Sequence, residues 1–141
     1  MNYFDMKLLA VSQNEAFARN AVAGFCVQCA PTLEEINDIK TAVSEAVTNV
    51  VVHAYDVDEG VVQIECRVRN EKEVEIIVRD FGKGIADVKE AMEPFFTTAP
   101  DDDERSGMGF TIIETFMDEM SVTSVLGEGT CVRMKKVIKG C

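Results

Sequence analysis

The stretch VVQIECRVRNEKEVEIIVRD, residues Val61–Asp80, decides the fold. On both sides of the short polar segment RNEKE, apolar residues alternate with charged or polar ones. A period of two is typical of strands that bury one face, and the polar segment predicts a tight turn. We therefore expect an antiparallel pair of strands with one face in the core and a charged face in solvent.

The sequence before this hairpin predicts one strand and two helices. Residues Phe4–Val11 have the composition of a strand. The S-x-x-E pattern of residues 12–15 is a capping box that would begin a helix over residues 14–29. Pro31 separates that helix from a second one over residues 32–55, which begins with a T-x-x-E capping box.

The sequence after the hairpin predicts a glycine loop, a short helix near residues 88–92, and a long loop over Glu93–Gly109. A loop of that length in a compact domain is often a functional lid. A helix over Phe110–Met120 and two strands, Ser121–Leu126 and Thr130–Ile138, complete the chain. The segment GEGT between these strands predicts a turn.

This order of elements predicts an α+β two-layer sandwich, in which helices cover one face of a mixed, mostly antiparallel sheet. The chain has 141 residues, a length that fits one domain over residues 1–141. We expect that domain to be large enough to bury its own core.

The formal net charge of −11 disfavours nucleic acid and anionic membranes as direct partners. The charge would speed the encounter with a protein that has a basic patch, although solubility alone also accounts for it. No apolar run approaches the length of about 20 residues that a membrane span needs. The N-terminal MNYFDMKLLAVSQ lacks the basic start of a signal peptide, so we expect a cytoplasmic protein.

The five cysteines do not predict a disulfide framework, because their number is odd and their spacing scattered. Cys26 and Cys29 form a C-x-x-C pattern, but no second such pattern follows, and His53 is the single histidine. A structural zinc site would therefore lack ligands. We expect thiols that lie in or near the core, rather than redox or metal chemistry.

Glu45 and Asn49 lie four positions apart in the predicted second helix, and so on one helical face. Their neighbours are mostly apolar, and polar groups on an apolar helix must be hydrogen-bonded or functional. A glutamate can act as a general base, and an asparagine oxygen can bind a hard cation such as Mg²⁺. The alternative is a solvated stripe on an amphipathic helix.

The pattern Asp80-x-Gly82-x-Gly84 follows directly after a predicted strand. A carboxylate at a strand end can accept a hydrogen bond from an amine such as the exocyclic amino group of adenine, and glycines let the backbone approach a flat ligand. An ordinary turn is the alternative. The letters D-F-G also occur in eukaryotic-type protein kinases, but their H-R-D-x-x-x-x-N and A-P-E motifs are missing here.

The segment SGMGF, Ser106–Phe110, places a glycine loop at the start of a predicted helix. Free N–H groups and the positive end of the helix dipole form an anion site there, which suits a triphosphate. Arg105 could reach a terminal phosphate, or it could balance the acidic residues before it. Thr130, at the start of the last strand, could support Asp80 in holding a base, although the segment is otherwise only a hairpin turn.

Taken together and in this order, these motifs resemble those of the GHKL ATPase superfamily, which includes DNA gyrase and histidine kinases. The segments SQNEAFAR, IKTAVSEAVTN, PFFTT and ERSGMGFTIIETFMDEM more specifically resemble the family of anti-sigma F factors of spore-forming bacteria. The resemblance implies the GHKL (Bergerat) ATP-binding fold. It also implies a dimeric protein-serine kinase that holds a sporulation sigma factor inactive and uses ATP to phosphorylate an anti-anti-sigma partner on serine.

The resemblance also implies residue roles. Glu45 matches the general base that would deprotonate the substrate serine, and Asn49 matches the Mg²⁺ ligand. Asp80 matches the aspartate that binds adenine. The other positions of the implied site shape the base pocket, cradle phosphates or assist adenine recognition: Gly82, Gly84, Arg105, Ser106, Gly107, Met108, Gly109 and Thr130.

Arg19 is an isolated charge on the predicted first helix. It is a candidate contact for a partner protein, although a solvated helix face is an equal alternative. Phe81 is a departure from the family pattern, which we expect to alter only the packing near the base.

Two other functions stay open at this level. One is a related stress-response anti-sigma serine kinase with a different sigma partner. The other is a nucleotide-dependent binding switch with little phosphotransfer, which Glu45 disfavours because a pure binder needs no base. A catalytic fragment of a histidine kinase is also disfavoured, because no dimerisation helix with a phosphoacceptor histidine precedes the domain.

Overall fold

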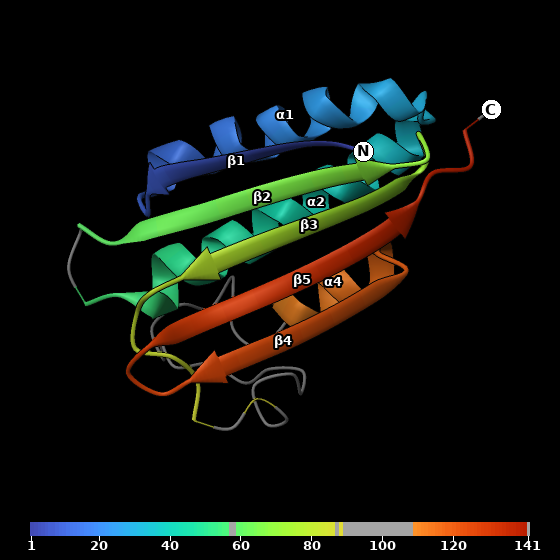
Figure 1. Ribbon diagram of the computed structural model, residues 1–141. Coiled ribbons are helices and arrows are strands. Elements are labelled where there is room, and N and C mark those ends of the chain that lie inside the picture. The colour runs from blue at the N-terminus through green and yellow to red at the C-terminus, as the bar shows by residue number, and fades with distance from the viewer. Residues whose placement is uncertain (57–58, 87, 89–108, 141) are drawn as a thin grey trace.

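The structure is a computed structural model that describes residues 1–56, 59–86, 88 and 109–140. Its centre is a five-stranded sheet in the order β1-β2-β3-β5-β4, seen from its open face in Figure 1. All four strand pairings are antiparallel. The strands are β1 (Asn2–Leu9), β2 (Val61–Arg69), β3 (Glu73–Asp80), β4 (Glu119–Val125) and β5 (Gly129–Val137).

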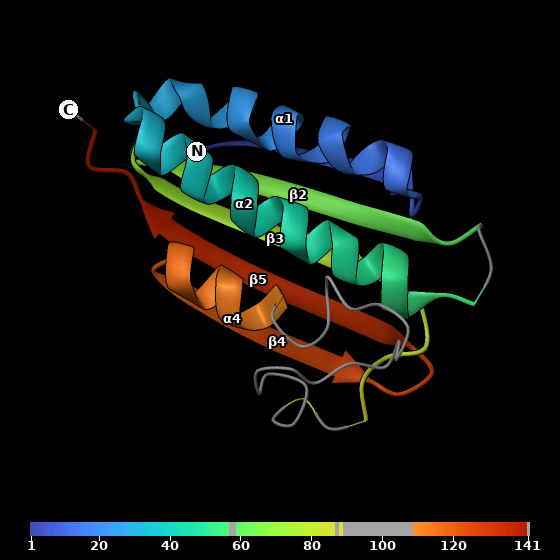
Figure 2. The same ribbon diagram turned by 180° about the vertical axis from the view of Figure 1, so that it is seen from behind.

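Within the described residues, three α-helices lie on the other face of the sheet, as Figure 2 shows from behind. They are α1 (Glu15–Cys26), α2 (Leu33–Asn49) and α4 (Gly109–Phe116). Short 3₁₀ helices, η1 (Ser12–Asn14) and η2 (Val27–Cys29), flank α1, and a π-helical turn, η3 (Val50–Ala54), continues α2. The predicted α+β two-layer sandwich is confirmed, and the sheet that the sequence allowed to be mixed is antiparallel throughout.

The core lies between the sheet and the helices. The inward positions of β2 and β3 alternate as predicted, with Ile64, Cys66 and Ile76 fully buried. They meet apolar residues on the inner side of α2, among them Ile39 and Val43. Burying one Val or Ile side chain stabilises the fold by about 1.5–3 kcal/mol, so this contact fixes α2 on the sheet.

The β2–β3 hairpin has the register that its alternation predicts. Val68 pairs with Val74 next to the turn, and Val62 pairs with Asp80 at the far end. Asn70 and Glu71 take up positive φ angles of 53° and 61° in the turn, a conformation that suits the twist of a hairpin. The register therefore carries Asp80 to the end of the sheet where α2 also ends (Figure 1).

One of the two predicted capping boxes is present. At the start of α2 the Thr32 hydroxyl accepts a hydrogen bond from the Glu35 amide, and the Glu35 carboxylate accepts one from the Thr32 amide. The Glu35 carboxylate also accepts hydrogen bonds from the amides of Lys139 at 2.8 Å and Gly140 at 3.1 Å. One side chain thus joins the start of α2 to the segment that follows β5.

The capping box predicted at Ser12 and Glu15 is wrong. Helix α1 begins at Glu15, after a 3₁₀ turn, and its N-cap residue Asn14 makes no capping hydrogen bond with its side chain. The Glu15 carboxylate instead forms an ion pair with Arg19, one turn along α1, at 2.7 Å. Ser12 begins η1 and is not the N-cap residue of α1, so the S-x-x-E pattern does not form a cap here.

The helix predicted over Phe110–Met120 is too long. Helix α4 ends at Phe116, and Glu119 already pairs with Lys135 across β4 and β5. Met120 faces inward from β4 and packs against the core. An apolar residue at that position is compatible with a helix or a strand. The structure shows a strand, because Met120 pairs with Met134 of β5.

The thiols of the described residues lie where the sequence predicted, and Cys141 falls outside those residues. Cys26, Cys29 and Cys66 are buried in the core, and Cys131 is half-buried. The neighbouring Cys26 thiol, as the larger cause, and burial raise the pKa of Cys66. Burial also raises the pKa of Cys29. Among the described helices, none is long and apolar enough to cross a membrane.

Candidate functional site

The carboxylate of Asp80 lies at the end of β3, with only 6% of the residue exposed. Its Oδ1 accepts hydrogen bonds from the amide of Gly82 at 3.0 Å and from the amide of Thr130 at 3.2 Å. Burial raises the pKa of Asp80, and the two N–H donors partly oppose that rise. One oxygen of Asp80 therefore joins Gly82 and Thr130, which were both predicted for the site. Thr130 lies fifty positions after Asp80 in the sequence.

Gly82 and Gly84 permit close backbone contacts on two sides of the loop after β3. A Cβ at position 82 would lie 2.0 Å from the carbonyl oxygen of Ala54, at the end of η3. Gly84 has a φ of +75°, and a Cβ there would lie 2.3 Å from the carbonyl oxygen of Val125. The loop is held between the end of α2 and the β4–β5 turn, so neither glycine can carry a side chain without movement.

Two backbone hydrogen bonds fix the middle of the same loop. The amide of Lys83 donates to the carbonyl of Ala54 at 2.9 Å, and its carbonyl accepts from the amide of Gly127 at 2.7 Å. Backbone pairing of this kind holds the loop without using its side chains. The side chain of Phe81 is accordingly 51% exposed.

Tyr55, which the sequence analysis did not select, ties the same loop to β2. Its hydroxyl accepts a hydrogen bond from the amide of Phe81 at 2.8 Å and donates one to the carbonyl of Val61 at 2.7 Å. The ring lies against Gly60, where a Cβ would come within 2.1 Å of it. The sequence feature that could have pointed to Tyr55 is its position, directly after an apolar helix and before a polar segment.

Glu45 and Asn49 lie on α2, half-buried, and Asn49 is the last residue of the regular helix before η3. A Cβ at Gly109 would lie 2.7 Å from Nδ2 and 2.8 Å from Oδ1 of Asn49. The structure therefore brings the carboxamide on α2 against the first residue of α4. Among the predicted glycines of the phosphate loop, Gly109 is the one that the described residues include.

Other predicted residues lie elsewhere. Arg105, Ser106, Gly107 and Met108 fall outside the described residues. Arg19 lies on α1, where its guanidinium pairs with Glu15 and its side chain is 37% exposed. Arg19 is therefore a surface residue of the first helix rather than a part of the group around Asp80.

Ser124 on β4 is a second residue that the sequence analysis missed. Its hydroxyl oxygen lies 2.7 Å from the amide of Ile85, 3.0 Å from the carbonyl of Gly129 and 2.8 Å from the hydroxyl of Thr130. The sequence did contain a sign of its role. Ser124 lies on the inward face of β4, where the other residues, Met120 and Val122, are apolar.

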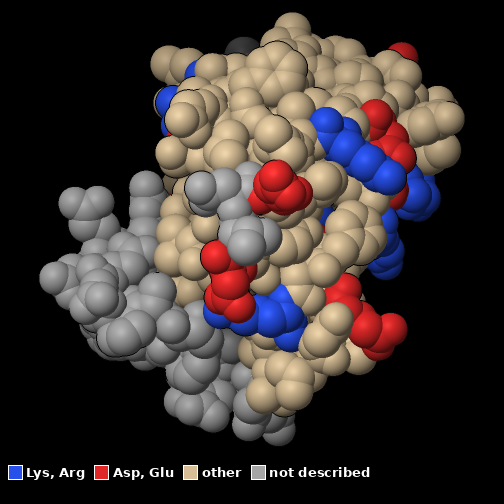
Figure 3. Space-filling view, turned by 90° about the vertical axis from the view of Figure 1, so that its left-hand side faces the viewer, with Lys and Arg blue, Asp and Glu red and all other residues tan. Residues whose placement is uncertain are grey.

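Figure 3 views the end of the molecule at which β3, α2 and the β4–β5 turn meet. The described side chains on this face are mostly uncharged, and acidic and basic ones are scattered among them. The site thus combines one buried carboxylate, close-packed glycine backbone, and a helix face with a carboxylate and an amide. Such a set can accept hydrogen bonds from an amine and can supply oxygen ligands to a hard cation.

The fold is shared with solved structures of low sequence identity. The RsbU and RsbW domains of Rv1364c from Mycobacterium tuberculosis match with a TM-score of 0.71 and 17% identity, covering 100% of this chain and 34% of that one. The catalytic domain of histidine kinase ThkA matches with a TM-score of 0.58 and 14% identity, covering 98% and 99% of the two chains. These similarities support the fold.

Sequence comparison extends the match to a family. The family model of the histidine kinase-like ATPase domain matches residues 10–136. The anti-sigma F factor of Clostridium novyi (strain NT) is 56% identical, with 98% of this chain and 96% of that protein covered. The anti-sigma F factor of Caldanaerobacter subterraneus subsp. tengcongensis is 54% identical, with 97% and 94% covered. The chain therefore belongs to the family of anti-sigma F factors and carries a histidine kinase-like ATPase domain.

Proposed function

We propose that this protein is an ATP-dependent protein-serine kinase that is also an anti-sigma factor. In this proposal it sequesters a sporulation sigma factor and phosphorylates its anti-anti-sigma antagonist on serine. The main observation behind the proposal is the buried Asp80 carboxylate, whose Oδ1 accepts hydrogen bonds from the amides of Gly82 and Thr130. That arrangement supports a preformed pocket for the base of ATP.

Asp80 would recognise adenine through its carboxylate. Since Oδ1 accepts the two backbone amides, Oδ2 is the oxygen that would accept a hydrogen bond from the exocyclic amino group. Gly82 and Gly84 would keep the adjoining backbone close to the ring. Thr130 would contribute its hydroxyl beside Asp80.

The other end of the nucleotide would lie between α2 and the start of α4. We propose that backbone and side chains over residues 105–109 (Arg105, Ser106, Gly107, Met108 and Gly109) cradle the phosphates, as a helix N-terminus can. Asn49 would hold Mg²⁺, because its carboxamide lies against Gly109 and an amide oxygen suits this cation. When bound, Mg²⁺ would neutralise charge on the phosphate oxygens.

Glu45 would be the general base. It lies one helical turn before Asn49, on the same face of α2. Its carboxylate would take the proton of the substrate serine hydroxyl as the serine oxygen bonds to the γ-phosphorus. The bond between that phosphorus and the bridging oxygen breaks, and ADP leaves.

Partner binding belongs to the same proposal. We infer a sigma factor and an anti-anti-sigma protein as partners, with Arg19 as a candidate contact and no direct role for nucleic acid or membrane. Because a sigma factor acts where RNA polymerase acts, we infer a cytoplasmic location. We also propose that residues 1–141 fold as one domain, since one apolar cluster joins the three described α-helices to the sheet.

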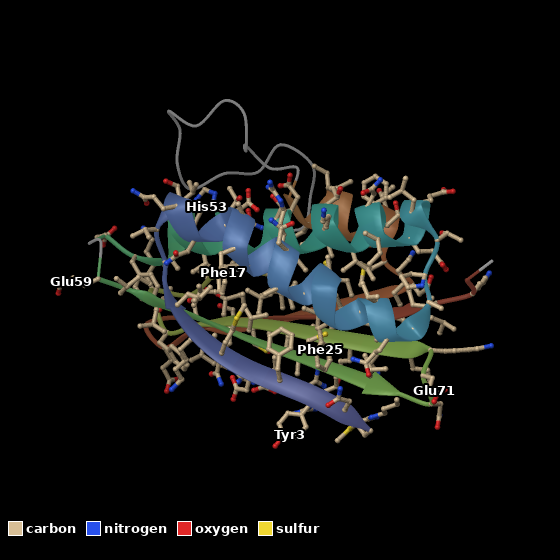
Figure 4. The ribbon with its side chains drawn as sticks, turned by 90° about the horizontal axis from the view of Figure 1, so that it is seen from above. Tyr3, Phe17, Phe25, His53, Glu59 and Glu71 are labelled. Carbon is tan, nitrogen blue, oxygen red and sulfur yellow. The ribbon has the colours of Figure 1, made fainter. Side chains whose placement is uncertain are left out.

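A homodimer is also part of the proposal. Strand β1 is an edge strand, and Tyr3 on it and Phe17 on α1 are 63% and 57% exposed. Figure 4 shows Phe17 on the helix side and Tyr3 on the far side of β1, with Phe25 between α1 and β1, where it stacks edge-to-face on Phe4 at 4.9 Å. Exposed aromatic side chains beside an open strand edge support self-association there.

Glu45→Gln tests the proposed activity. We expect this variant to bind ATP as the wild type does and to lose serine phosphorylation, which a filter-binding assay and a phosphoserine assay would measure separately. Normal phosphorylation by Glu45→Gln would remove Glu45 from the mechanism. If wild type binds ATP and its partners without phosphorylating either, the protein is a binding switch instead.

Affinity capture with ATP or ADP present tests the partners. We expect a sporulation sigma factor among the bound proteins in at least one nucleotide state. Recovery of a different sigma factor would favour a stress-response relative, and recovery of none would contradict the anti-sigma role.

A further inference from the structure

The hydroxyl of Ser124 connects the glycine loop after β3, residues 81–85, to the start of β5. The amide of Ile85 donates a hydrogen bond to Ser124 Oγ at 2.7 Å, and Ser124 Oγ donates to the carbonyl of Gly129 at 3.0 Å. The hydroxyl of Thr130 lies 2.8 Å from the same oxygen. Ser124 is half-buried, and these three contacts all involve its single hydroxyl oxygen.

Distance alone allows either hydroxyl to donate in the bond between Ser124 and Thr130, and counting protons favours one direction. A serine hydroxyl has one proton to donate and two lone pairs to accept with. The carbonyl of Gly129 can only accept, so the proton of Ser124 goes there, and the amide of Ile85 takes one lone pair. The remaining lone pair of Ser124 accepts the proton of Thr130. The hydroxyl of Thr130 is then left as an acceptor toward any other group.

We propose that Ser124 is a positioning residue that selects the base of the nucleotide by fixing the Thr130 hydroxyl as a hydrogen-bond acceptor. The inference rests on the proposed nucleotide site. An acceptor at Thr130 has the same polarity as the Asp80 carboxylate, to which the backbone amide of Thr130 donates at 3.2 Å. Together they complement a base that presents an amino group and disfavour one that presents a carbonyl oxygen at that place.

The surrounding packing makes this assignment specific. Gly84 lies against the carbonyl of Val125, the residue after Ser124, and Gly127 donates to the carbonyl of Lys83 at 2.7 Å. The loop after β3 and the β4–β5 turn therefore also meet through one backbone hydrogen bond and one close backbone contact that do not involve the Ser124 hydroxyl. Removing that hydroxyl would leave these contacts in place, so its effect on Thr130 can be measured in a folded protein.

The test uses Ser124→Ala, Thr130→Val and the double variant in the full chain. Titration calorimetry would measure the affinities for ATP and for inosine triphosphate, which has a carbonyl oxygen in place of the exocyclic amino group. Ser121→Ala, a serine on the exposed face of the same strand, is the matched control. Thermal unfolding of each variant would confirm that it folds.

We expect Ser124→Ala to lower the preference for ATP over inosine triphosphate by about three- to tenfold, the ratio that one neutral hydrogen bond supplies. The freed Thr130 hydroxyl could then donate to a carbonyl. In the Thr130→Val background, the same substitution is expected to change the preference by less than about twofold, because residues that act through one another are not additive.

An unchanged preference in Ser124→Ala would overturn the inference. A full effect of Ser124→Ala in the Thr130→Val background would also overturn it, because Ser124 would then act through the loop rather than through Thr130. Asp80→Asn separates these results from failure of the proposed function. If wild type does not bind ATP, or Asp80→Asn binds it equally well, the nucleotide site itself is wrong.

Discussion

The carboxamide of Asn49 lies against Gly109, close enough that a Cβ at position 109 would come within 2.7 Å of its Nδ2. This contact joins the end of the regular part of α2 to the start of α4. In the proposed function the same carboxamide holds Mg²⁺. In that proposal, a side chain at position 109 would have to displace the carboxamide that holds the metal.

Gly109→Ala is expected to weaken binding of Mg²⁺–ATP more than binding of ATP in the presence of EDTA. The new methyl group would displace the Asn49 side chain, which can move because it is flexible, so the fold should survive. Calorimetry with and without Mg²⁺ would measure both affinities. Gly24→Ala is the control, since a Cβ there meets nothing within 4 Å. Equal losses with and without Mg²⁺ would argue against a metal role for Asn49.

Asp80→Asn is expected to weaken nucleotide binding while leaving the unliganded fold as stable or more stable. Asparagine keeps the Oδ1 that accepts the amides of Gly82 and Thr130 and removes the charge that burial disfavours. Because burial raises the folded-state pKa of Asp80, the folded state holds its proton more tightly than the unfolded state does. The stability of wild type should then fall relative to the variant as pH rises from the unfolded-state pKa through the higher folded-state value.

Chemical denaturation of both proteins at several pH values would measure this difference. The curves should converge in acid, where Asp80 is protonated in both states, and separate toward neutral pH. A variant that is less stable than wild type at neutral pH would show that the charge of Asp80 stabilises the fold.

Glu35→Gln should destabilise the protein by about 1 kcal/mol, the usual effect of losing a charged partner at a helix cap. The Thr32 amide is the main cause that lowers the pKa of Glu35, and the amides of Lys139 and Gly140 lower it further. A lowered pKa gives stability that is present above the unfolded-state pKa and is lost as pH falls through the folded-state value. The gap between wild type and Glu35→Gln should therefore close in acid.

Glu34→Gln is the matched control for Glu35, because Glu34 is an exposed acid in the same first turn of α2. Urea unfolding would give the free energies. If Glu34→Gln has an equally large effect, the helix dipole rather than the contact with the end of the chain accounts for the loss.

Tyr55→Phe should loosen the start of the glycine loop. The substitution removes the hydroxyl that accepts from the Phe81 amide and donates to the Val61 carbonyl, while the ring keeps its place against Gly60. We expect a loss of about 1 kcal/mol in stability and faster hydrogen exchange at the Phe81 amide. Exchange measured by NMR would check this, and unchanged protection of that amide would contradict the hydrogen bond.

The elements that could be predicted are those in which one periodicity dominates. The β2–β3 hairpin, Val61–Asp80, was predicted with its boundaries because its apolar residues alternate with mostly charged or polar ones. The end of α4 could not be, because an inward Met120 satisfies both a helix and a strand, and only the pairing of β4 with β5 distinguishes them. The π-helical turn after Asn49 has no such pattern in the sequence.

The residues of the candidate site also divide into those that could be predicted from the sequence and those that could not. Asp80, Gly82 and Thr130 were predicted from motifs, and the structure brings them together through two hydrogen bonds. Ser124 and Tyr55 were missed because they act on backbone groups and on another hydroxyl, and such partners become neighbours only in the folded chain. A polar residue in the inward phase of an otherwise apolar strand, as at Ser124, is the signal by which similar cases can be found.

The loop after Asp80 is fixed through its main chain and not through its side chains. The amides of Phe81, Gly82 and Lys83 all have partners, whereas the Phe81 side chain is 51% exposed. Position 81 can therefore carry a fluorescent label without loss of the bonds that shape the loop. Such a label would report the arrival and departure of a ligand at Asp80 in real time.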